Sequence, residues 1–367
     1  MGVKKLTEVC SPKQWKTISQ TEMLPEGYPV YGANGIIGYY NEYNHENPTV
    51  LITCRGATCG TLNISKPFSY VNGNAMALDN VIEDVDEKYL YYYLQSRGLK
   101  DIISGSAQPQ ITIQNLTKVI VSYPSIEEQK RIVSMLDKAD EIRAKKKLAN
   151  DKLDEFLKST FISMFGDPVN CTKGFDTKHF ADICKNIFGG GTPSKAHPEY
   201  YIGEIPWVTP KDMKTLIINS SIDYINENAV ANSSTKLIPV NSLLMVIRSG
   251  ILKHTLPVAI NKVEVTLNQD MKAFVLNEEL ANVYFVLYQL KLLEKIILKN
   301  VRSVTADNIE FNLIKNLELN VPPLELQNKF AQIVEHVDAQ KQKNELVIEQ
   351  MNNLFNSLSQ RAFKGEI

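Results

Sequence analysis

The residues that most often carry catalysis are present, but they are not grouped at catalytic spacings. Phe188-Gly-Gly-Gly-Thr-Pro193 is a glycine-rich loop of the kind that can bind the phosphate of a nucleotide. It lacks the lysine of a P-loop and the Gly-x-Gly-x-x-Gly spacing. Pro193 would also interrupt a following helix unless it were the first residue of that helix. A turn shaped by glycine is the alternative, and the sequence favours it.

Other catalytic and metal-binding motifs are incomplete. Asn320-Val-Pro-Pro323 differs from the Asn-Pro-Pro-aromatic motif of adenine methyltransferases, because Val321 intervenes and Leu324 is not aromatic. The sequence has no Gly-x-Ser-x-Gly and no His-x-x-x-His, and its five histidines are scattered. Cys54 and Cys59 lie five residues apart, without a second pair of ligands at zinc spacing. We therefore expect no catalysis, no metal and no cofactor in this chain.

The elements that must position the polar residues occur twice. The segment Asn115–Gln129 returns, with changes, as Phe311–Gln327. Pro124 pairs with Pro322 at a displacement of 198 positions. This displacement exceeds the roughly 20–50 residues of a solenoid repeat, so it indicates a duplicated domain.

The bulk composition is that of a globular protein of two or three domains. The 367 residues are 44% hydrophobic and 22% charged, and no apolar run reaches the roughly 18 residues of a membrane helix. The N-terminus has no apolar signal-peptide core, and five cysteines without a Cys-x-x-Cys pair favour a reducing compartment. We therefore expect a cytoplasmic protein without a membrane segment. The net charge of −1 either disfavours DNA as a partner or confines the basic surface to a patch.

Each half of the sequence is typical of a mixed α/β domain. In the first half, Tyr28–Tyr40 carries an Asn-Gly pair between β-prone runs and predicts a hairpin. Pro48–Thr53 and Ala75–Leu78 predict buried strands, and Tyr89–Leu94 begins a helix of about three turns. The corresponding segments of the second half are Ser242–Ile247, Asn268–Phe274 and Tyr284–Leu290.

A long charged helix follows each half. No proline or glycine interrupts residues 126–165, and apolar residues recur every three and four positions, which is typical of a coiled coil. The predicted contact positions are Met135, Ala139, Ile142, Lys146, Ala149, Leu153 and Phe156 in the first helix, and Ile333, Val337, Gln340, Asn344, Val347, Met351, Leu354 and Leu358 in the second.

The two contact stripes match at the displacement of 198 positions, so we expect the helices to pair with each other. Lys146 and Asn344 interrupt the stripes at equivalent positions, and a polar residue there fixes the register of a coiled coil. The chain must return to its second domain, which makes the pair antiparallel. The predicted fold is therefore α+β or α/β, with two similar globular domains, an antiparallel coiled coil and pseudo-twofold symmetry. The alternative is that each helix packs separately on its own domain.

Several motifs carry a family resemblance. Pro124–Gln129 and Pro322–Gln327 both begin a long helix with Pro-x-x-Glu-x-Gln. Gly190-Gly-Thr-Pro-Ser194, with Ile205–Asp212, is similar to the opening of many target-recognition domains, and Tyr28–Gly38 resembles another such opening. Together with the duplication, these motifs resemble the specificity subunit of type I restriction-modification systems over essentially the whole chain.

The resemblance implies a division of roles. Residues 1–124 and 168–322 would be target-recognition domains, each reading one half of a split sequence in double-stranded DNA. Residues 125–167 and 323–367 would be spacer helices that also dock two methyltransferase subunits. Those subunits would supply S-adenosylmethionine and catalysis. Restriction subunits, with motor and nuclease activity, would complete the complex, so ATP and Mg²⁺ are also expected on partner subunits.

The residues that would contact DNA are polar side chains on loops, where recognition usually resides. Arg55 and Arg248 each follow a buried strand, and the alternative for either is a salt bridge that braces the loop. The remaining candidates are Gln108, Gln110, Lys195, Lys211, Lys214, Lys253, Arg302, Ser303 and Thr305.

Two other functions stay open at this point. One is a self-contained enzyme that modifies DNA, which the incomplete motifs disfavour. The other is a coiled-coil scaffold that joins two peptide-binding domains.

Overall fold

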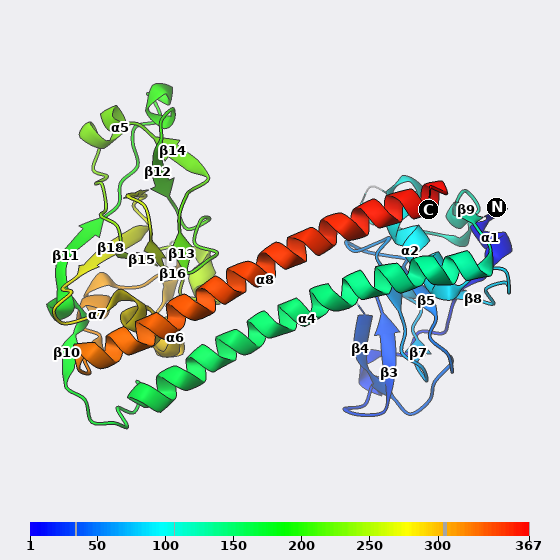
Figure 1. Ribbon diagram of the computed structural model, residues 1–367, viewed down its shortest axis with the longest axis horizontal. Helices are drawn as coiled ribbons and strands as arrows, with labels where there is room; N and C mark the ends of the chain where they lie inside the picture. Colours follow the sequence, from blue (N-terminus) through cyan, green and yellow to red (C-terminus); the bar gives the residue numbers. More distant parts are fainter. Residues whose placement is uncertain (34, 106, 304–306, 367) are drawn as a thin grey trace. The chain divides into compact units, whose positions relative to one another are not determined.

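The computed structural model describes residues 1–33, 35–105, 107–303 and 307–366, which divide into two compact units. Unit 1 comprises residues 1–148 and 344–367, and unit 2 comprises residues 149–343. Each unit contains a globular part and portions of two long helices, α4 (Ile126–Phe165) and α8 (Leu324–Lys364), shown in green and red in Figure 1. This division follows packing and therefore splits each helix, whereas the four segments expected from the sequence remain a prediction.

The described residues of unit 1 form a four-stranded sheet in the order β2-β8-β5-β6 and a three-stranded sheet in the order β4-β3-β7. Strands β1 and β9 pair as a further antiparallel ladder. Helix α2 packs against β5 and β6. The elements before α4 are β1 (Gly2–Lys5), α1 (Leu6–Val9), β2 (Ser11–Gln14), η1 (Gln20–Glu22), β3 (Tyr28–Gly32), β4 (Gly35–Tyr40), β5 (Val50–Thr53), β6 (Leu62–Ile64), β7 (Tyr70–Val71), β8 (Ala75–Asp79), α2 (Glu87–Arg97), η2 (Lys100–Ile102), α3 (Ile113–Leu116) and β9 (Ile120–Tyr123).

The local predictions for unit 1 are confirmed. Strands β3 and β4 form the expected antiparallel hairpin, with Gly32 opposite Gly35. Strand β5 is buried along its whole length, as is most of β8. Helix α2 starts where Asp86 caps it by accepting a hydrogen bond from the backbone N of Tyr89 at 3.0 Å. An aspartate at this position satisfies a backbone group that the first turn leaves without a partner.

The described residues of unit 2 form a five-stranded sheet in the order β11-β18-β15-β16-β13 and a three-stranded sheet in the order β14-β12-β17. The ladders β10-β21 and β19-β20 accompany them. The elements are β10 (Thr177–His179), η3 (Phe180–Ile183), β11 (Cys184–Gly189), η4 (Pro198–Tyr201), β12 (Ile205–Val208), β13 (Ile217–Ile218), β14 (Asp223–Ile225), α5 (Glu227–Ala231), β15 (Leu243–Val246), η5 (Gly250–Lys253), β16 (Val258–Asn261), β17 (Thr266–Leu267), β18 (Met271–Leu276), α6 (Val283–Leu298), β19 (Arg302–Ser303), β20 (Asp307–Asn308), α7 (Phe311–Lys315) and β21 (Glu318–Asn320).

Unit 2 repeats the central elements of unit 1 and adds a lobe. Strand β15 corresponds to β5, β18 corresponds to β8, and α6 corresponds to α2, as the sequence predicts. The lobe contains β12, β14 and α5, and Figure 1 shows it extending away from the five-stranded sheet. Its small core is formed by Trp207, Ile225 and Ala229. Trp207 is thus a core residue of the lobe.

The long helices run antiparallel within each unit. In unit 1, the side chain of Arg143 donates to Asn352 Oδ1 at 2.9 Å. In unit 2, Lys341 Nζ donates to Asp154 Oδ1 at 2.8 Å. Within unit 1, Lys146 Nζ also donates to Asn344 Oδ1, so residue numbers fall along α8 as they rise along α4, as expected of an antiparallel coiled coil.

The buried side of the two helices differs from the predicted contact stripe at two positions in each helix. Ile142, Phe156 and Leu354 are 40%, 49% and 44% exposed, and Gln340 is also exposed. Their next neighbours along the chain (Arg143, Leu157, Phe355 and Lys341) are half-buried or buried instead. The other predicted positions are either buried (Ala139, Val337, Asn344) or half-buried (Met135, Lys146, Ala149, Leu153, Ile333, Val347, Met351, Leu358).

The physical reason for this difference is that the helices pack on the globular cores as well as on each other. Leu136 and Ala139 belong to the main apolar core of unit 1, and Leu157 and Phe161 belong to that of unit 2. A helix that contacts both a domain and a second helix buries a wider stripe than a two-stranded coiled coil does. Among the described residues, no helix is both long and apolar enough to span a membrane.

Candidate nucleic-acid interface

In unit 1, Arg55 and two predicted glutamines come together on an exposed loop pair. Arg55 follows β5, and its backbone forms an isolated antiparallel bridge with Gln110. On either side of this bridge, Ile111 N donates to Cys54 O, and Gly56 N donates to the carbonyl of residue 109, both at 3.0 Å. The side chains of Arg55, Gln108 and Gln110 are exposed. These three candidates therefore share one surface.

Unit 2 forms the same backbone ladder at equivalent positions. Arg248 follows β15 and bridges to Asn308. Ile309 N donates to Ile247 O at 2.9 Å, and Ser249 N donates to the carbonyl of residue 307 at 2.9 Å. Residues 307–309 lie 198 positions after residues 109–111, the displacement of the sequence repeat. Arg248 is thus the structural counterpart of Arg55.

The β19–β20 hairpin presents the second strand of this ladder. Arg302 pairs with Asn308 through the backbone. The side chains of Arg302 and Ser303 lie outside what the structure describes, as does the whole of Thr305. Lys253, at the end of η5, places its Nζ 3.6 Å from Asp307 Oδ2.

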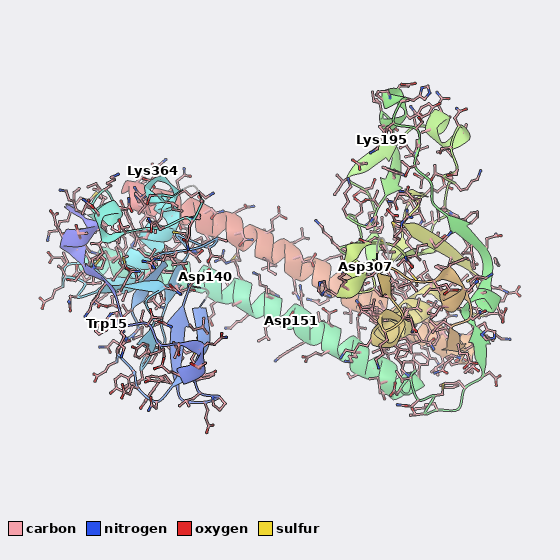
Figure 2. All side chains as sticks on the ribbon, turned by 180° about the vertical axis from the view of Figure 1, so that it is seen from behind. Trp15, Asp140, Asp151, Lys195, Asp307 and Lys364 are labelled. Atoms are coloured by element: carbon pink, nitrogen blue, oxygen red, sulfur yellow. The ribbon has the colours of Figure 1, made fainter. Side chains whose placement is uncertain are left out.

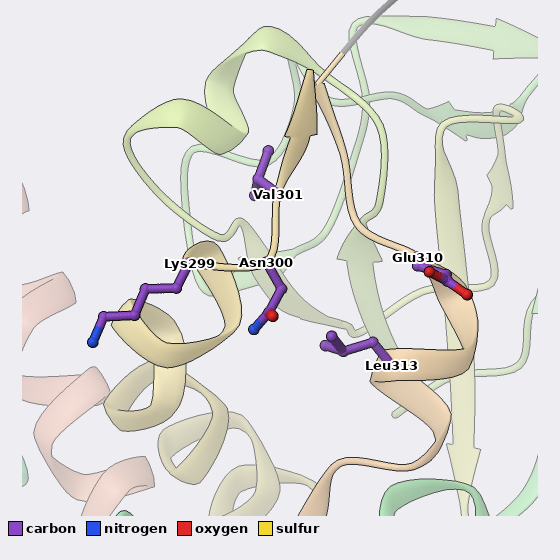
Figure 3. Close-up of a pocket in the computed structure, with 5 residues that line it drawn as sticks. All are labelled: Lys299, Asn300, Val301, Glu310 and Leu313. Atoms are coloured by element: carbon purple, nitrogen blue, oxygen red, sulfur yellow. The ribbon is translucent and has the colours of Figure 1, made fainter. Parts of the chain in front are cut away.

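A pocket lies at the foot of the same hairpin. Figure 3 shows it between the end of α6 and the start of α7, where the chain enters β19. Its volume is about 260 Å³, and it is lined by Lys299, Asn300, Val301, Glu310 and Leu313. The hairpin therefore stands beside a hollowed surface with both polar and apolar side chains.

The predicted lysines of unit 2 lie on other segments. Figure 2 shows Lys195 on the lobe, away from Asp307 of the ladder. Lys211 and Lys214 follow β12 and are exposed. The carboxylate of Asp223, 2.6 Å from Lys211 Nζ, raises the pKa of this lysine. Lys211 is thus a firmly charged group, but the contacts of the described residues do not join these lysines to the ladder.

The glycine run is shaped by close packing. An added Cβ on Gly190 would lie 1.7 Å from the carbonyl oxygen of Asn268. The carbonyl of Gly191 accepts a hydrogen bond from the indole nitrogen of Trp207 at 3.1 Å. These contacts support the glycine-turn interpretation of the loop, because only glycine fits so near to another backbone.

Sequence reasoning overlooked two polar residues of this surface. Asn308 is the counterpart of Gln110, and the displacement of 198 positions could have identified it. No feature of the sequence identifies Asp270 as a partner of Arg248, because it lies 22 residues after Arg248 and the two side chains meet only in the folded chain. The Nε of Arg248 donates to Asp270 Oδ1 at 2.6 Å. The alternative interpretation of Arg248, a salt bridge at the loop, is therefore present in the structure.

The sequence matches the family model of the type I restriction modification DNA specificity domain over residues 1–152 and 172–350. It is similar to the EcoR124I/EcoR124II specificity subunit of Escherichia coli, with 32% identity over 268 residues. That alignment covers 68% of this chain but only 63% of the relative. It is also similar to the MjaIX specificity subunit of Methanocaldococcus jannaschii, with 27% identity over 345 residues, 87% of this chain and 77% of that protein.

Solved structures show the same fold. The S subunit of a type I restriction-modification system from M. genitalium superimposes with a TM-score of 0.67 at 15% identity, covering 99% of this chain and 96% of that one. A chain from a structure of type I complex assembly and conformational transition gives a TM-score of 0.56 at 15% identity, with 100% and 98% covered. The predicted fold class is thereby confirmed. Because the family model spans nearly all of the sequence, this chain belongs to the type I restriction-modification DNA specificity family.

Proposed function

We propose that this chain is the DNA-recognition subunit of a type I restriction-modification complex, in which each unit reads one half of a split target. The observation that carries this proposal is the repeated ladder. Each unit presents an arginine and a carboxamide side by side, Arg55 with Gln110 and Arg248 with Asn308. Arginine suits guanine or phosphate, and a carboxamide suits adenine. Loops held by a rigid sheet are where such contacts usually reside.

The exposed apolar residues of the long helices support docking of two methyltransferase subunits. Leu148 and Leu346 are 54% and 59% exposed, and Phe156 and Leu354 are 49% and 44% exposed. Within each pair the residues lie 198 positions apart. Large exposed apolar side chains mark interaction sites when they gather, and a duplicated set suits two copies of one partner.

The chemistry then resides on the partners. The methyltransferase subunits supply S-adenosylmethionine and methyl transfer, and the restriction subunits supply ATP-driven motion and cleavage with Mg²⁺. This chain contributes base recognition and the separation of its two half-sites, and it works in the cytoplasm without catalysis of its own. Its net charge of −1 is compatible with this role because a partner can add basic surface that holds the phosphates.

Methylome sequencing tests the proposal. Cells that express this chain with a type I methyltransferase that binds it are compared with cells that express the methyltransferase alone. We expect a new methyladenine motif of two half-sites with a fixed gap, present only with this chain. If no motif arises while the methyltransferase is shown to be expressed and bound, the proposal is wrong and a scaffold function replaces it.

A further inference from the structure

The equivalent arginines of the two ladders have different surroundings. In unit 2, Nε of Arg248 is bound to Asp270, and the Arg248 side chain remains 47% exposed. Arginine has five N–H donors, so this contact leaves the two terminal Nη groups available. Within the described part of unit 2, no acceptor binds those Nη groups. The Arg248 guanidinium is therefore held at Nε, while its Nη groups stay accessible to a ligand.

Asp270 is itself fixed. Its Oδ2 accepts from the side-chain amide of Asn268 at 3.0 Å, and its backbone N donates to Asn268 Oδ1 at 3.2 Å. Asn268 is 8% exposed. The backbone carbonyl of Asp270 accepts from Ile247 N at 2.8 Å and Arg248 N at 3.2 Å. Asp270 is thus tied through its carboxylate to Asn268 and through its backbone carbonyl to the strand end that carries Arg248.

Unit 1 has a neutral residue where unit 2 has Asp270. The carbonyl of Asn74 accepts from Cys54 N at 3.2 Å, the same contact that Asp270 makes with Ile247. Asn74 is exposed and carries no charge. Across the described residues of unit 1, the guanidinium of Arg55 has no carboxylate partner. The two arginines share a backbone position but not an electrostatic environment.

We infer that Arg248 is a specificity-determining residue that reads a guanine in the half-site of unit 2, and that Asp270 is its positioning residue. This inference rests on the proposed function. A guanidinium held through Nε presents a planar pair of donors whose geometry matches guanine O6 and N7. The carboxylate reduces the conformational freedom that the arginine would lose on binding. Asn268 contributes by holding the carboxylate.

Arg55 has the opposite properties. An exposed guanidinium without a carboxylate partner suits a phosphate, which accepts donors from many directions. A phosphate contact adds affinity that falls with salt, but it carries no sequence information directly. Arg55 therefore provides a matched control within the same chain.

The test measures base discrimination in the purified complex of the full chain with its methyltransferase. Duplexes in which each base pair of both half-sites is replaced in turn compete with the parent target. For Arg248→Lys, we expect discrimination to fall by about 5- to 150-fold at one guanine of one half-site. The other half-site, read by unit 1, should keep its preferences. Lysine retains the charge but not the planar pair of donors.

The positioning role has its own readout. Asp270→Asn should relax the same guanine position by a smaller factor, and it should have no further effect in the Arg248→Lys background. Arg55→Gln should instead lower affinity evenly for all sequences and reduce the salt dependence by about one counterion.

The inference is overturned if Arg248→Lys leaves every base preference unchanged and lowers only the melting temperature, because Arg248 would then be a brace for the loop. It is also overturned if Asp270→Asn relaxes both half-sites equally. A wild-type complex that marks no split motif would contradict the proposed function, and this inference with it.

Discussion

A buried glutamine fastens the first turn of each long helix. Gln129 is fully buried, and its Oε1 accepts from the backbone N of Asp86 at 2.8 Å. Its Nε2 donates to the carbonyls of Asp84 and Pro124 at 2.8 and 2.9 Å. Asp86 is the N-cap of α2. One side chain therefore joins the beginning of α4 to the beginning of α2.

Gln327 makes the equivalent contacts in unit 2. It is also fully buried, and it binds Asn282 N at 2.9 Å, Leu280 O at 3.0 Å and Pro322 O at 2.8 Å. Asn282 is the N-cap of α6. The Pro-x-x-Glu-x-Gln motif thus has a physical explanation, because its glutamine satisfies backbone groups that would otherwise be buried without partners.

Gln327→Leu should destabilise unit 2 strongly. Leucine has a similar size but cannot bond the three backbone groups, each of which costs about 1–3 kcal/mol when it is buried without a partner. We expect a total loss of about 2–5 kcal/mol in the free energy of unfolding, measured by urea denaturation of the full chain. Gln332→Leu, at an exposed position of the same helix, is the control. Equal losses for both variants would contradict this role.

At the scale of single elements, one polar contact interrupts the apolar contacts between helices α4 and α8. Asn344 is 2% exposed, and its Oδ1 accepts a hydrogen bond from Lys146 Nζ at 3.1 Å. The two residues are 198 positions apart, so they are equivalent residues of the two helices. A polar residue in such a position specifies register at a cost in stability.

Asn344→Leu should therefore destabilise the helix pair, because it leaves the ammonium group of Lys146 without this acceptor. We expect a loss of about 1–3 kcal/mol. The double variant K146L/N344L should recover this loss or exceed the wild-type stability, since an apolar pair avoids the desolvation of a charge.

Urea unfolding of the purified full chain measures both effects. Gln342→Leu, an exposed position close to Asn344 on α8, controls for a general effect of leucine. A double variant that is no more stable than Asn344→Leu would show that the polar contact does not set the stability of this region.

The limits of the helices could be predicted, but their buried side could not. The absence of proline and glycine predicts a helix over 126–165, and these are the observed bounds of α4. The spacing of apolar residues along α4 does not show whether Met135 or Leu136 is the more deeply buried of the two. Leu136 is fully buried because the core of unit 1 covers it, in addition to the partner helix. Tertiary packing supplies this information, which a repeat of three and four residues lacks.

For the whole molecule, duplication is the feature that the sequence makes most visible. It predicts the recurrence of Arg55 as Arg248, and the structure places the two arginines at equivalent positions of two separate ladders, one in each unit. It does not predict their different environments, because the change from Asn74 to Asp270 is a single neutral-to-acidic difference in a turn. Repetition thus identifies where the two units correspond, and only folded contacts show where they differ.

The proposed role of the helices as a spacer leads to a prediction at this scale. Inserting four residues between Lys147 and Leu148 lengthens α4 by about 6 Å, which is on the order of one to two base pairs of DNA. We expect the gap between the half-sites to grow by that amount, while both half-site sequences stay the same. Methylome sequencing of cells that express the longer chain with its methyltransferase measures the gap directly.

A matched insertion separates helix length from chain length. Four residues added in the exposed loop at Asn219–Ser220 lengthen the chain equally but leave α4 and α8 unaltered, so the gap should not change. If the α4 insertion also leaves the gap unchanged while methylation persists, the helices do not set the spacing. If it alters the bases of a half-site instead, recognition depends on the helices and not on the ladders. The two readouts, gap and bases, therefore assign spacing and sequence recognition to different parts of the chain.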